Sequence, residues 1–270
     1  LDAAETHFTE SLELYRSLGD GQREIGRLIN LAYVANAKGD STGAERRFRE
    51  ARTACRELGL REEEGAATHG IANVLQNQGR WTEAESELRD ALALFLEIGG
   101  KRGQLASLIA LGTIAAHLGN LAEAETQLQQ GLVLARELGD RPSQATALAE
   151  LGALAVRQGK FSQGDGQLQE AKSIVDELGD KMTGFGVLLR STEARVLEGR
   201  WHEAEVLLAE ALAINRDRES LLLLARLEHE RGRGARAVAA LLEAKALAGG
   251  GWRREDEERL QEYRGRGGRG

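Results

Sequence analysis

The fold is decided by residues 73–92, which read NVLQNQGRWTEAESELRDAL. Gly79 divides this stretch into two parts. After the glycine, Ala84, Leu88 and Ala91 follow one another at intervals of four and three residues. Such intervals place apolar side chains on one helix face, and glycine readily adopts the left-handed backbone with which many helices end. The stretch therefore predicts the end of one helix, a tight turn and the start of a second helix.

The same arrangement recurs along the chain with a period of 40 residues. An Ala-Glu pair and two series of glycines keep this register, and alternating helices with short turns form an all-α solenoid. We therefore predict antiparallel helix pairs that cross at small residues such as Ala84 and Ala124. The Ala-Glu pairs stand at 4–5, 44–45, 84–85, 124–125 and 204–205, with Gly164-Asp165 as a variant, and the glycines are Gly39, Gly79, Gly119, Gly159, Gly199 and Gly19, Gly59, Gly99, Gly139, Gly179.

Two kinds of N-cap are expected at the helix starts. Asp20, Asp140 and Asp180 each follow a glycine, and an aspartate side chain accepts hydrogen bonds from the first free backbone N–H groups of a helix. Thr42 with Glu45, and likewise 82 with 85, have the spacing of a capping box.

The period divides the chain into one solenoid, over residues 1–248, and a C-terminal segment. The solenoid is expected to begin with an orphan second helix at 1–18, whose apolar Phe8, Leu12 and Tyr15 lack a partner. Because the chain starts within a repeat and without Met, we expect it to be tethered to an upstream domain. The expected helix pairs are 22–58, 61–98, 101–138, 141–178, 181–216 and 219–248, followed by a capping helix at 252–263 and a disordered Gly/Arg tail at 264–270.

Composition excludes several classes of protein. One Cys in 270 residues excludes an internal disulfide and a multi-cysteine metal site. The net charge of −7 gives no general attraction to nucleic acid or to a membrane, although the Gly/Arg tail leaves RNA binding as a minor alternative. Residues 103–122 lack charged groups but hold several polar ones, so they indicate a covered helix and a turn rather than a membrane span. We expect a cytoplasmic protein.

No cluster of residues points to catalysis, a metal or a cofactor. Cys55 falls on the predicted core stripe, and the five histidines occupy unrelated repeat positions without ligand spacing. The glycine-rich residues 99–103 follow a helix rather than a strand and lack the phosphate-loop spacing, which favours a helix–helix turn. We therefore expect a protein that is not an enzyme and has no cofactor.

The chain resembles the tetratricopeptide repeat family in the turn and second helix of each copy. The residues that carry the resemblance are Gly79-Arg80-Trp81 up to Ala84, Gly119-Asn120-Leu121 up to Ala124, and Gly199-Arg200-Trp201 up to Ala204. The copies lack the family's closing proline and are longer than its common repeat, like those of kinesin light chains and of bacterial maltose-regulator-type sensor arms. The resemblance implies a right-handed α-solenoid whose first helices line a concave groove.

The first helices are predicted to carry a peptide-binding groove. Asparagine offers a donor and an acceptor, so it can hold both the N–H and the C=O of a peptide backbone. Small residues at 37, 70, 110 and 153 are expected to keep the floor of the groove low, and the repeated Lys and Asn of the family's chaperone-binding clamp are missing. The candidate residues are Asn30, Tyr33, Asn73, Asn77, Thr113, His117, Arg157, Arg190 and Glu193, the charged ones expected to read the charge of the ligand.

These features predict a non-enzymatic protein–protein interaction scaffold that binds an extended peptide or a helix. The alternative is a ligand-sensing or regulatory arm of a larger bacterial signalling protein, either an ATPase-type transcriptional activator or a Ser/Thr kinase. An upstream phosphate-loop or kinase motif would distinguish the two.

Overall fold

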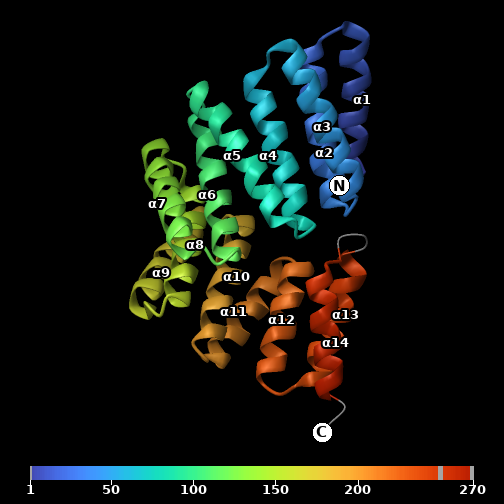
Figure 1. The fold of residues 1–270 in the computed structure, drawn as a ribbon. Helices are drawn as coiled ribbons and strands as arrows, with labels where there is room; N and C mark the ends of the chain where they lie inside the picture. Colours follow the sequence, from blue (N-terminus) through green and yellow to red (C-terminus); the bar gives the residue numbers. More distant parts are fainter. Residues whose placement is uncertain (1, 249–251, 268–270) are drawn as a thin grey trace. The chain divides into compact units, whose positions relative to one another are not determined.

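The computed structural model describes residues 2–248 and 252–267, with side chains up to residue 265, and these residues form fourteen helices and no strand (Figure 1). The all-α prediction is confirmed. The helices are α1 (Asp2–Leu18), α2 (Gly21–Ala37), α3 (Ser41–Leu58), α4 (Arg61–Asn77), α5 (Trp81–Glu97), α6 (Lys101–His117), α7 (Leu121–Leu138), α8 (Arg141–Arg157), α9 (Phe161–Leu178), α10 (Lys181–Leu197), α11 (Trp201–Ile214), α12 (Arg218–Glu230), α13 (Gly234–Ala248) and α14 (Arg254–Gly267).

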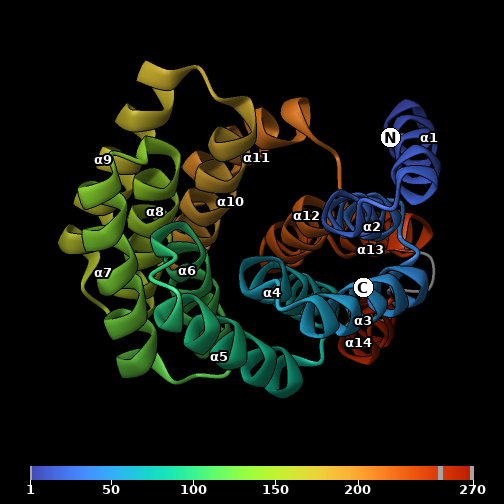
Figure 2. The same ribbon diagram turned by 90° about the horizontal axis from the view of Figure 1, so that it is seen from above.

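The chain forms two compact units, and each is described by itself. Unit 1 covers Leu1–Leu118 and unit 2 covers Gly119–Gly270. In unit 1, α2 packs on α3 and α4 on α5 as antiparallel pairs, and the first helices α2, α4 and α6 stack side by side. In unit 2 the pairs are α8–α9, α10–α11 and α12–α13, and Figure 2 shows α8 between its partner α9 and the next first helix, α10. Each unit is thus a stack of helix pairs.

The turns between helices are built as the glycine series predicts. Gly59, for example, ends α3 with a left-handed backbone, at a φ of 69°. The side chains of Asp20, Asp140 and Asp180 cap α2, α8 and α10 by accepting backbone N–H groups. These glycines and aspartates therefore mark helix ends, whereas the predicted pair 101–138 is divided, with α6 in unit 1 and α7 in unit 2.

The predicted capping boxes at Thr42 and at residue 82 are wrong. The N-cap of α3 is Asp40, whose carboxylate accepts from the backbone N–H of Gly43 at 2.9 Å. Thr42 already lies in the first turn of that helix, and α5 starts after Arg80 without any side-chain cap. Glu45 is therefore free to pair with other residues.

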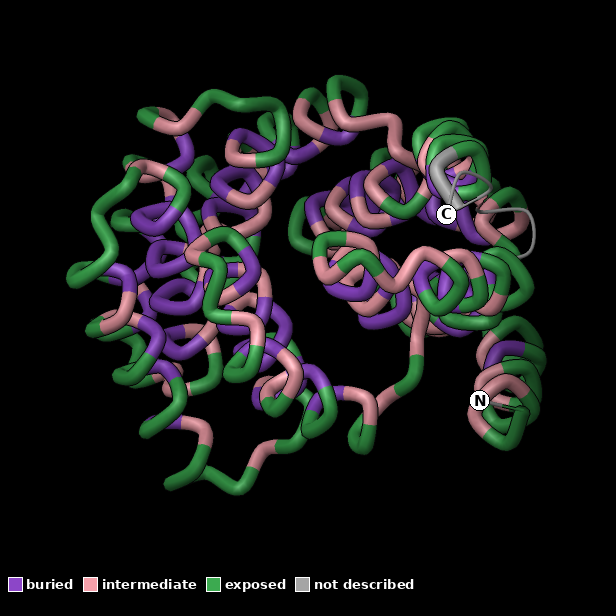
Figure 3. Tube along the Cα trace, turned by 90° about the horizontal axis from the view of Figure 1, so that it is seen from below, coloured by how far each residue is buried: buried purple, intermediate pink, exposed green. Residues whose placement is uncertain are grey.

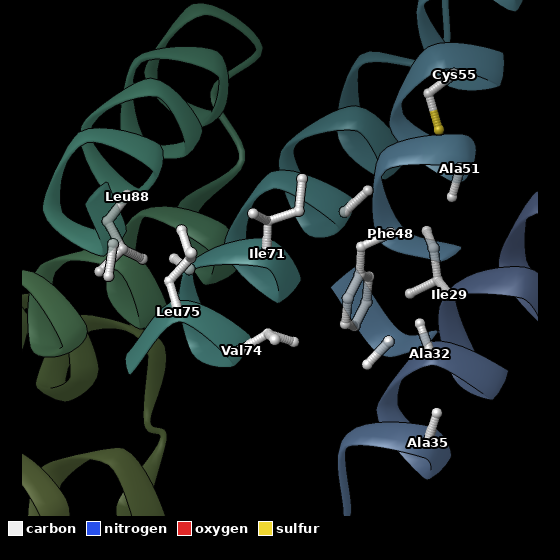
Figure 4. Close-up of a cluster of buried hydrophobic side chains, with 14 of the residues drawn as sticks. Ile29, Ala32, Ala35, Phe48, Ala51, Cys55, Ile71, Val74, Leu75 and Leu88 are labelled. Atoms are coloured by element: carbon white, nitrogen blue, oxygen red, sulfur yellow. The ribbon is translucent and has the colours of Figure 1, made fainter. Parts of the chain in front are cut away.

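The core of unit 1 is centred on Phe48 of α3, which lies between Ile29 of α2 and Ile71 of α4 (Figure 4). A Cβ atom on Gly70 would lie 2.3 Å from the Phe48 ring, closer than van der Waals contact permits. Gly70 thus admits this large ring between the helices. The prediction that Gly70 lowers the floor of a groove is wrong, because the glycine faces the core.

Small residues lie at the helix crossings, as predicted. Ala84 and Ala124 are fully buried. In unit 2, α8 and α9 approach so closely that a Cβ atom on Gly152 would lie 3.0 Å from the backbone oxygen of Gly164. The packing of α8 against α7, α9 and α10 buries almost the whole circumference of this helix. Ala153 is buried as well, so it does not form the open floor of a groove. Figure 3 shows buried residues along the helices and mostly exposed residues in the turns.

The ends of the chain differ from the prediction. The apolar side of α1 is not left uncovered, because Leu12 is buried and the Arg27 guanidinium of α2 lies 5.9 Å from the centre of the Phe8 ring. At the other end, the final helix extends to Gly267, past the expected start of the tail. It is held by Tyr263, whose ring stacks on His229 at 3.8 Å. Leu1 and residues 268–270 lie outside the described residues.

Residues 103–122 form most of α6 and the turn after it, as predicted, and Leu111 and Ile114 are buried in unit 1. Within the described parts of the chain, no helix has the length and apolar character needed to cross a membrane.

Candidate functional site

The candidate residues of unit 1 lie on the three stacked first helices, α2, α4 and α6. Asn30 of α2 and Asn73 of α4 are both half-buried. Neither amide has a hydrogen-bond partner among the described residues, yet both amides remain reachable from solvent. A half-buried amide without a partner keeps two donors and an acceptor available for another molecule. These two asparagines therefore match the predicted groove residues most closely.

Asn77 has a side-chain hydrogen-bond partner, whereas Asn73 has none among the described residues. Nδ2 of Asn77 donates to the side-chain oxygen of Asn36 at 3.2 Å, which links the ends of α4 and α2. Asn36 is a neighbour that the sequence analysis missed, because it lies one position before the predicted stripe. The available signal was that α2 and α4 together carry four asparagines, Asn36 among them.

Tyr33 lies above the core of unit 1. Its ring meets the ring of Phe48 edge to face, with the centroids 4.8 Å apart, and 39% of the residue is exposed. Edge-to-face aromatic pairs are favourable and orient both rings. The Tyr33 ring is therefore held in a defined position on the same helix as Asn30, and burial raises the pKa of its phenol.

Thr113 and His117 of α6 have partners inside unit 1. The Thr113 hydroxyl donates to the backbone oxygen of Ile109 in its own helix at 3.0 Å. The His117 ring packs on Trp81 at the start of α5, with the centroids 3.9 Å apart. The position of this imidazole is thus set by the indole rather than by an open groove.

The three charged candidates lie in unit 2, where they form a closed ion cluster. Arg190 of α10 donates from Nε to Glu150 at 2.8 Å, from Nη1 to Glu193 at 3.1 Å and from Nη2 to Glu219 at 2.8 Å. Arg157 donates to the other oxygen of Glu193. Two guanidinium groups thus share three carboxylates, so neither arginine is held ready for a ligand.

The electrostatics of this cluster follow from its geometry. Attraction by Glu150 and the other carboxylates raises the pKa of Arg190 well above its usual range. Burial alone would raise the pKa of Glu193, but Arg190 and Arg157 outweigh burial and hold that pKa below its usual value. Glu193 therefore stays ionised at neutral pH and binds within the protein.

The glutamate of the Ala-Glu pairs has a role that the repeat pattern did not indicate. Glu45 is buried and accepts hydrogen bonds from Arg80 at 3.2 Å and from Gln78 at 3.3 Å, both in the turn of the next helix pair. Similar bonds link successive turns elsewhere, and the basic residues at the turns were the available signal. The other examples are Glu5 with Lys38, Glu125 with Gln158 and Lys160, and Glu205 with Arg233.

Two groups that could support other chemistry, the thiol of Cys55 and the imidazole of His69, are buried and half-buried respectively. Cys55 is buried, and burial raises the pKa of its thiol to about 11, which keeps it protonated and unreactive at neutral pH. Burial also lowers the pKa of His69. Within the described residues, no group of His, Cys, Asp and Glu side chains is arranged to hold a metal ion.

Residues 63–137 and 103–175 match the tetratricopeptide repeat family. No curated protein matches the chain in sequence. Among solved structures, BtubC (BKLC) from P. vanneervenii is 19% identical and matches with a TM-score of 0.63 over 79% of this chain and 90% of that one. The nearly identical TPR-like repeats of a kinesin light chain candidate from Podosopora anserina are also 19% identical, with a TM-score of 0.52 over 69% of this chain and 92% of that one.

A regulator is also similar in fold. The Rap conjugation gene regulator of plasmid pLS20, solved in complex with the Phr* peptide, is 13% identical, with a TM-score of 0.71 over 90% of this chain and 72% of that one. At such identities these likenesses concern the fold alone, and the fold is that of tetratricopeptide-like helical solenoids.

Proposed function

We propose that this chain, which is a tetratricopeptide repeat protein, is a non-enzymatic interaction module that binds an extended peptide on the α2–α4–α6 face of unit 1. The observation that carries the proposal is the pair Asn30 and Asn73, half-buried on adjacent helices and without partners among the described residues. An extended peptide has unpaired N–H and C=O groups along its length, and an amide side chain satisfies both kinds.

The surroundings of the two asparagines support this proposal. Tyr33 offers an aromatic surface beside them, and Asn77 and Asn36 continue the amide row towards the helix ends. None of these side chains is charged, so the face suits the peptide backbone and neutral side chains rather than a highly charged ligand. The shared fold with a regulator solved in complex with the Phr* peptide is in keeping with a peptide ligand.

The test is to measure peptide affinity after removing both unpartnered amides. A peptide is first selected from a displayed random library on the wild-type chain, and its affinity is then measured by titration calorimetry. Asn30→Ala with Asn73→Ala should weaken binding by roughly tenfold or more, since each lost hydrogen bond costs about 0.5–1.5 kcal/mol. The thermal unfolding midpoint should hardly change, because neither amide bonds to another of the described residues.

The control variant must lie away from this face and from the buried ion pairs. Arg49 does not qualify, because it bonds Glu45 at 2.7 Å, whereas the Arg46 side chain is 69% exposed and lies 3.8 Å from Glu50. Arg46→Ala should leave both affinity and stability unchanged. Full affinity in the asparagine double variant, for every selected peptide, would overturn the proposed function.

A second candidate is a regulatory arm, tethered to an upstream effector domain of a bacterial signalling protein. The observation that favours it is the shared fold with a conjugation gene regulator. Reading the gene upstream of Leu1 tests this candidate: a phosphate-loop or kinase motif would support it, and a start codon directly before Leu1 would refute it. A cytoplasmic location belongs to both candidates, in keeping with the single free thiol at Cys55.

A further inference from the structure

The fifth helix pair departs from the repeat pattern at two core positions. Ser191 stands where the four earlier first helices carry leucine or isoleucine, and Arg195 stands where they carry alanine or leucine. A polar residue at such a position costs stability unless it gains a partner. The equivalent residues are Leu31, Ile71, Leu111 and Leu151 for Ser191, and Ala35, Leu75, Ala115 and Ala155 for Arg195.

A cavity of about 550 Å³ lies at these two positions. It belongs to unit 2 alone and is formed by α9, α10 and α11, with α10 in contact with both of the others. Apolar walls come from Leu168, Val206 and Leu207, and 48% of Val206 is exposed. Such a volume can receive one large side chain with part of its backbone.

Ser191 and Arg195 bring unused hydrogen-bond donors to this cavity. Only 8% of Ser191 is exposed, and its hydroxyl has no partner among the described residues. The Arg195 side chain is 11% exposed; its Nη1 bonds to Asp165 and, at 2.6 Å, to Glu198, and its Nε lies 3.7 Å from Glu203. Its Nη2 has no described partner and is not fully buried, and Arg195 lines the cavity. A ligand here therefore meets at least two free donors.

The charges around the cavity determine which kind of hydrogen-bond acceptor a ligand can place there. The guanidinium groups of Arg195 and Arg200 face three carboxylates, those of Asp165, Glu198 and Glu203. Lys172 is paired with Asp176 at 3.1 Å. The site thus has no excess positive charge to attract an anion, and its free donors match a neutral acceptor such as a backbone carbonyl.

We propose that this cavity is a second interaction site, which takes a segment of a partner protein anchored by one apolar side chain. That side chain packs against Leu168 and Val206, while neighbouring backbone carbonyls accept hydrogen bonds from Ser191 and Arg195. The site goes beyond the proposed function, because it involves none of the amide residues of unit 1. The polar residues of α10 that break the repeat pattern thereby acquire a function.

The experiment selects peptides that need this cavity. A displayed library of random peptides is enriched on the wild-type chain and depleted on the Ser191→Leu variant, which restores the repeat residue and fills the cavity. Because four other pairs carry leucine or isoleucine there, this variant should fold, which thermal unfolding verifies. The matched control is Thr192→Ala, which also restores a small repeat residue but lies outside the cavity lining.

The proposal expects surviving peptides that share an apolar residue and bind wild type and Thr192→Ala equally well. Their affinity should fall at least about tenfold in Ser191→Leu, since a hydrogen bond and the apolar contact are both lost. Val206→Glu, an exposed change on the cavity wall, should weaken the same peptides. The Asn30→Ala and Asn73→Ala double variant should bind them normally, which separates this site from the proposed function.

Two results would overturn the proposal. The first is that no peptide distinguishes wild type from Ser191→Leu. The second is that the survivors are rich in acidic residues and lose affinity steeply with added salt, which would mean an anion site rather than a site for neutral carbonyl groups.

Discussion

The faces of α2 and α4 in unit 1 and of α8 and α10 in unit 2 use the same repeat positions in opposite ways. Asn30 and Arg190 are equivalent residues, as are Asn73 and Glu193. The asparagines have no partner among the described residues, whereas the arginine and the glutamate are bonded within a closed cluster. The comparison teaches that the helix pairs provide the same scaffold and that the side chains alone decide whether a face is open to a ligand.

The physical reason is the cost of leaving charges unpaired. A partly buried arginine or glutamate recruits an opposite charge from its surroundings, since an unpaired ion loses much of its hydration. An amide of similar size loses less and can stay half-buried beside water. A ligand on the face of α8 and α10 would therefore have to displace existing ion pairs, while a ligand on unit 1 would not.

The largest expected effect concerns the scaffold that the two faces share. Ala84→Trp in unit 1 and Ala124→Trp in unit 2 should each reduce the free energy of unfolding by about 3 kcal/mol or more, because both alanines are fully buried at a helix crossing. Ala93→Trp, on the exposed side of α5, is the matched control and should change little. Urea unfolding measures all three variants. A large loss at only one crossing would show that the two scaffolds are not equivalent.

The second-largest expected effect comes from breaking the closed ion cluster of unit 2. Arg190→Ala should cost about 2 kcal/mol at pH 7, because it leaves Glu150 and Glu193 with too little positive charge. The pKa of Glu193 is lowered in the folded state, so its stabilisation is present above the pKa of an unfolded glutamate, about 4.3, and is lost as the pH falls through the folded value.

Denaturant unfolding of wild type and Arg190→Ala at pH 7 and at pH 3 measures this dependence. The difference between the two proteins should be smaller at pH 3, because the stabilisation from Glu193 is lost as the pH falls through its lowered pKa. A difference that stays constant with pH would mean that Arg190 contributes packing rather than charge.

A third effect, of about 1–3 kcal/mol, concerns the aromatic pair beneath the open face. Gly70→Ala should destabilise unit 1, because the added Cβ would lie 2.3 Å from the Phe48 ring. Phe48→Leu, which restores the residue of most other copies, should relieve this clash, so the double variant should lose less than the sum of the two single losses. Thermal or urea unfolding of the four proteins measures the coupling. Strict additivity would show that the glycine and the ring do not limit each other.

The smallest effect distinguishes the two asparagines of α4. Asn77→Ala should lower the free energy of unfolding by about 0.5 kcal/mol, because its exposed hydrogen bond to Asn36 is lost. Asn73→Ala should change stability by even less, since Asn73 has no partner to lose among the described residues. High-precision urea unfolding can resolve this difference. A larger loss at Asn73 would reveal an internal bond and weaken its assignment to ligand binding.

The repeat pattern was enough to predict most of the helices and the turns between them. The glycine series, the capping aspartates and the apolar stripes each act within one or two turns of chain, so the helices and their turns could be predicted from local spacing. Among the predictions that failed, one did so because of a residue nearby in the sequence and one because of a residue on another helix. The N-cap of α3 is Asp40 and not Thr42. Gly70 was assigned to a groove because the sequence pattern does not reveal that it faces the ring of Phe48, which lies on another helix.

The candidate site shows the same limit. The sequence by itself determined which positions face away from the pair interface, and it placed polar residues such as Asn73 and Arg190 there. Only the tertiary structure decided that Asn73 has no partner among the described residues and that Arg190 is surrounded by Glu150, Glu193 and Glu219. The reason is physical: periodicity fixes the direction of a side chain on its own helix, but partners come from neighbouring helices, whose distances depend on the packing of the whole unit.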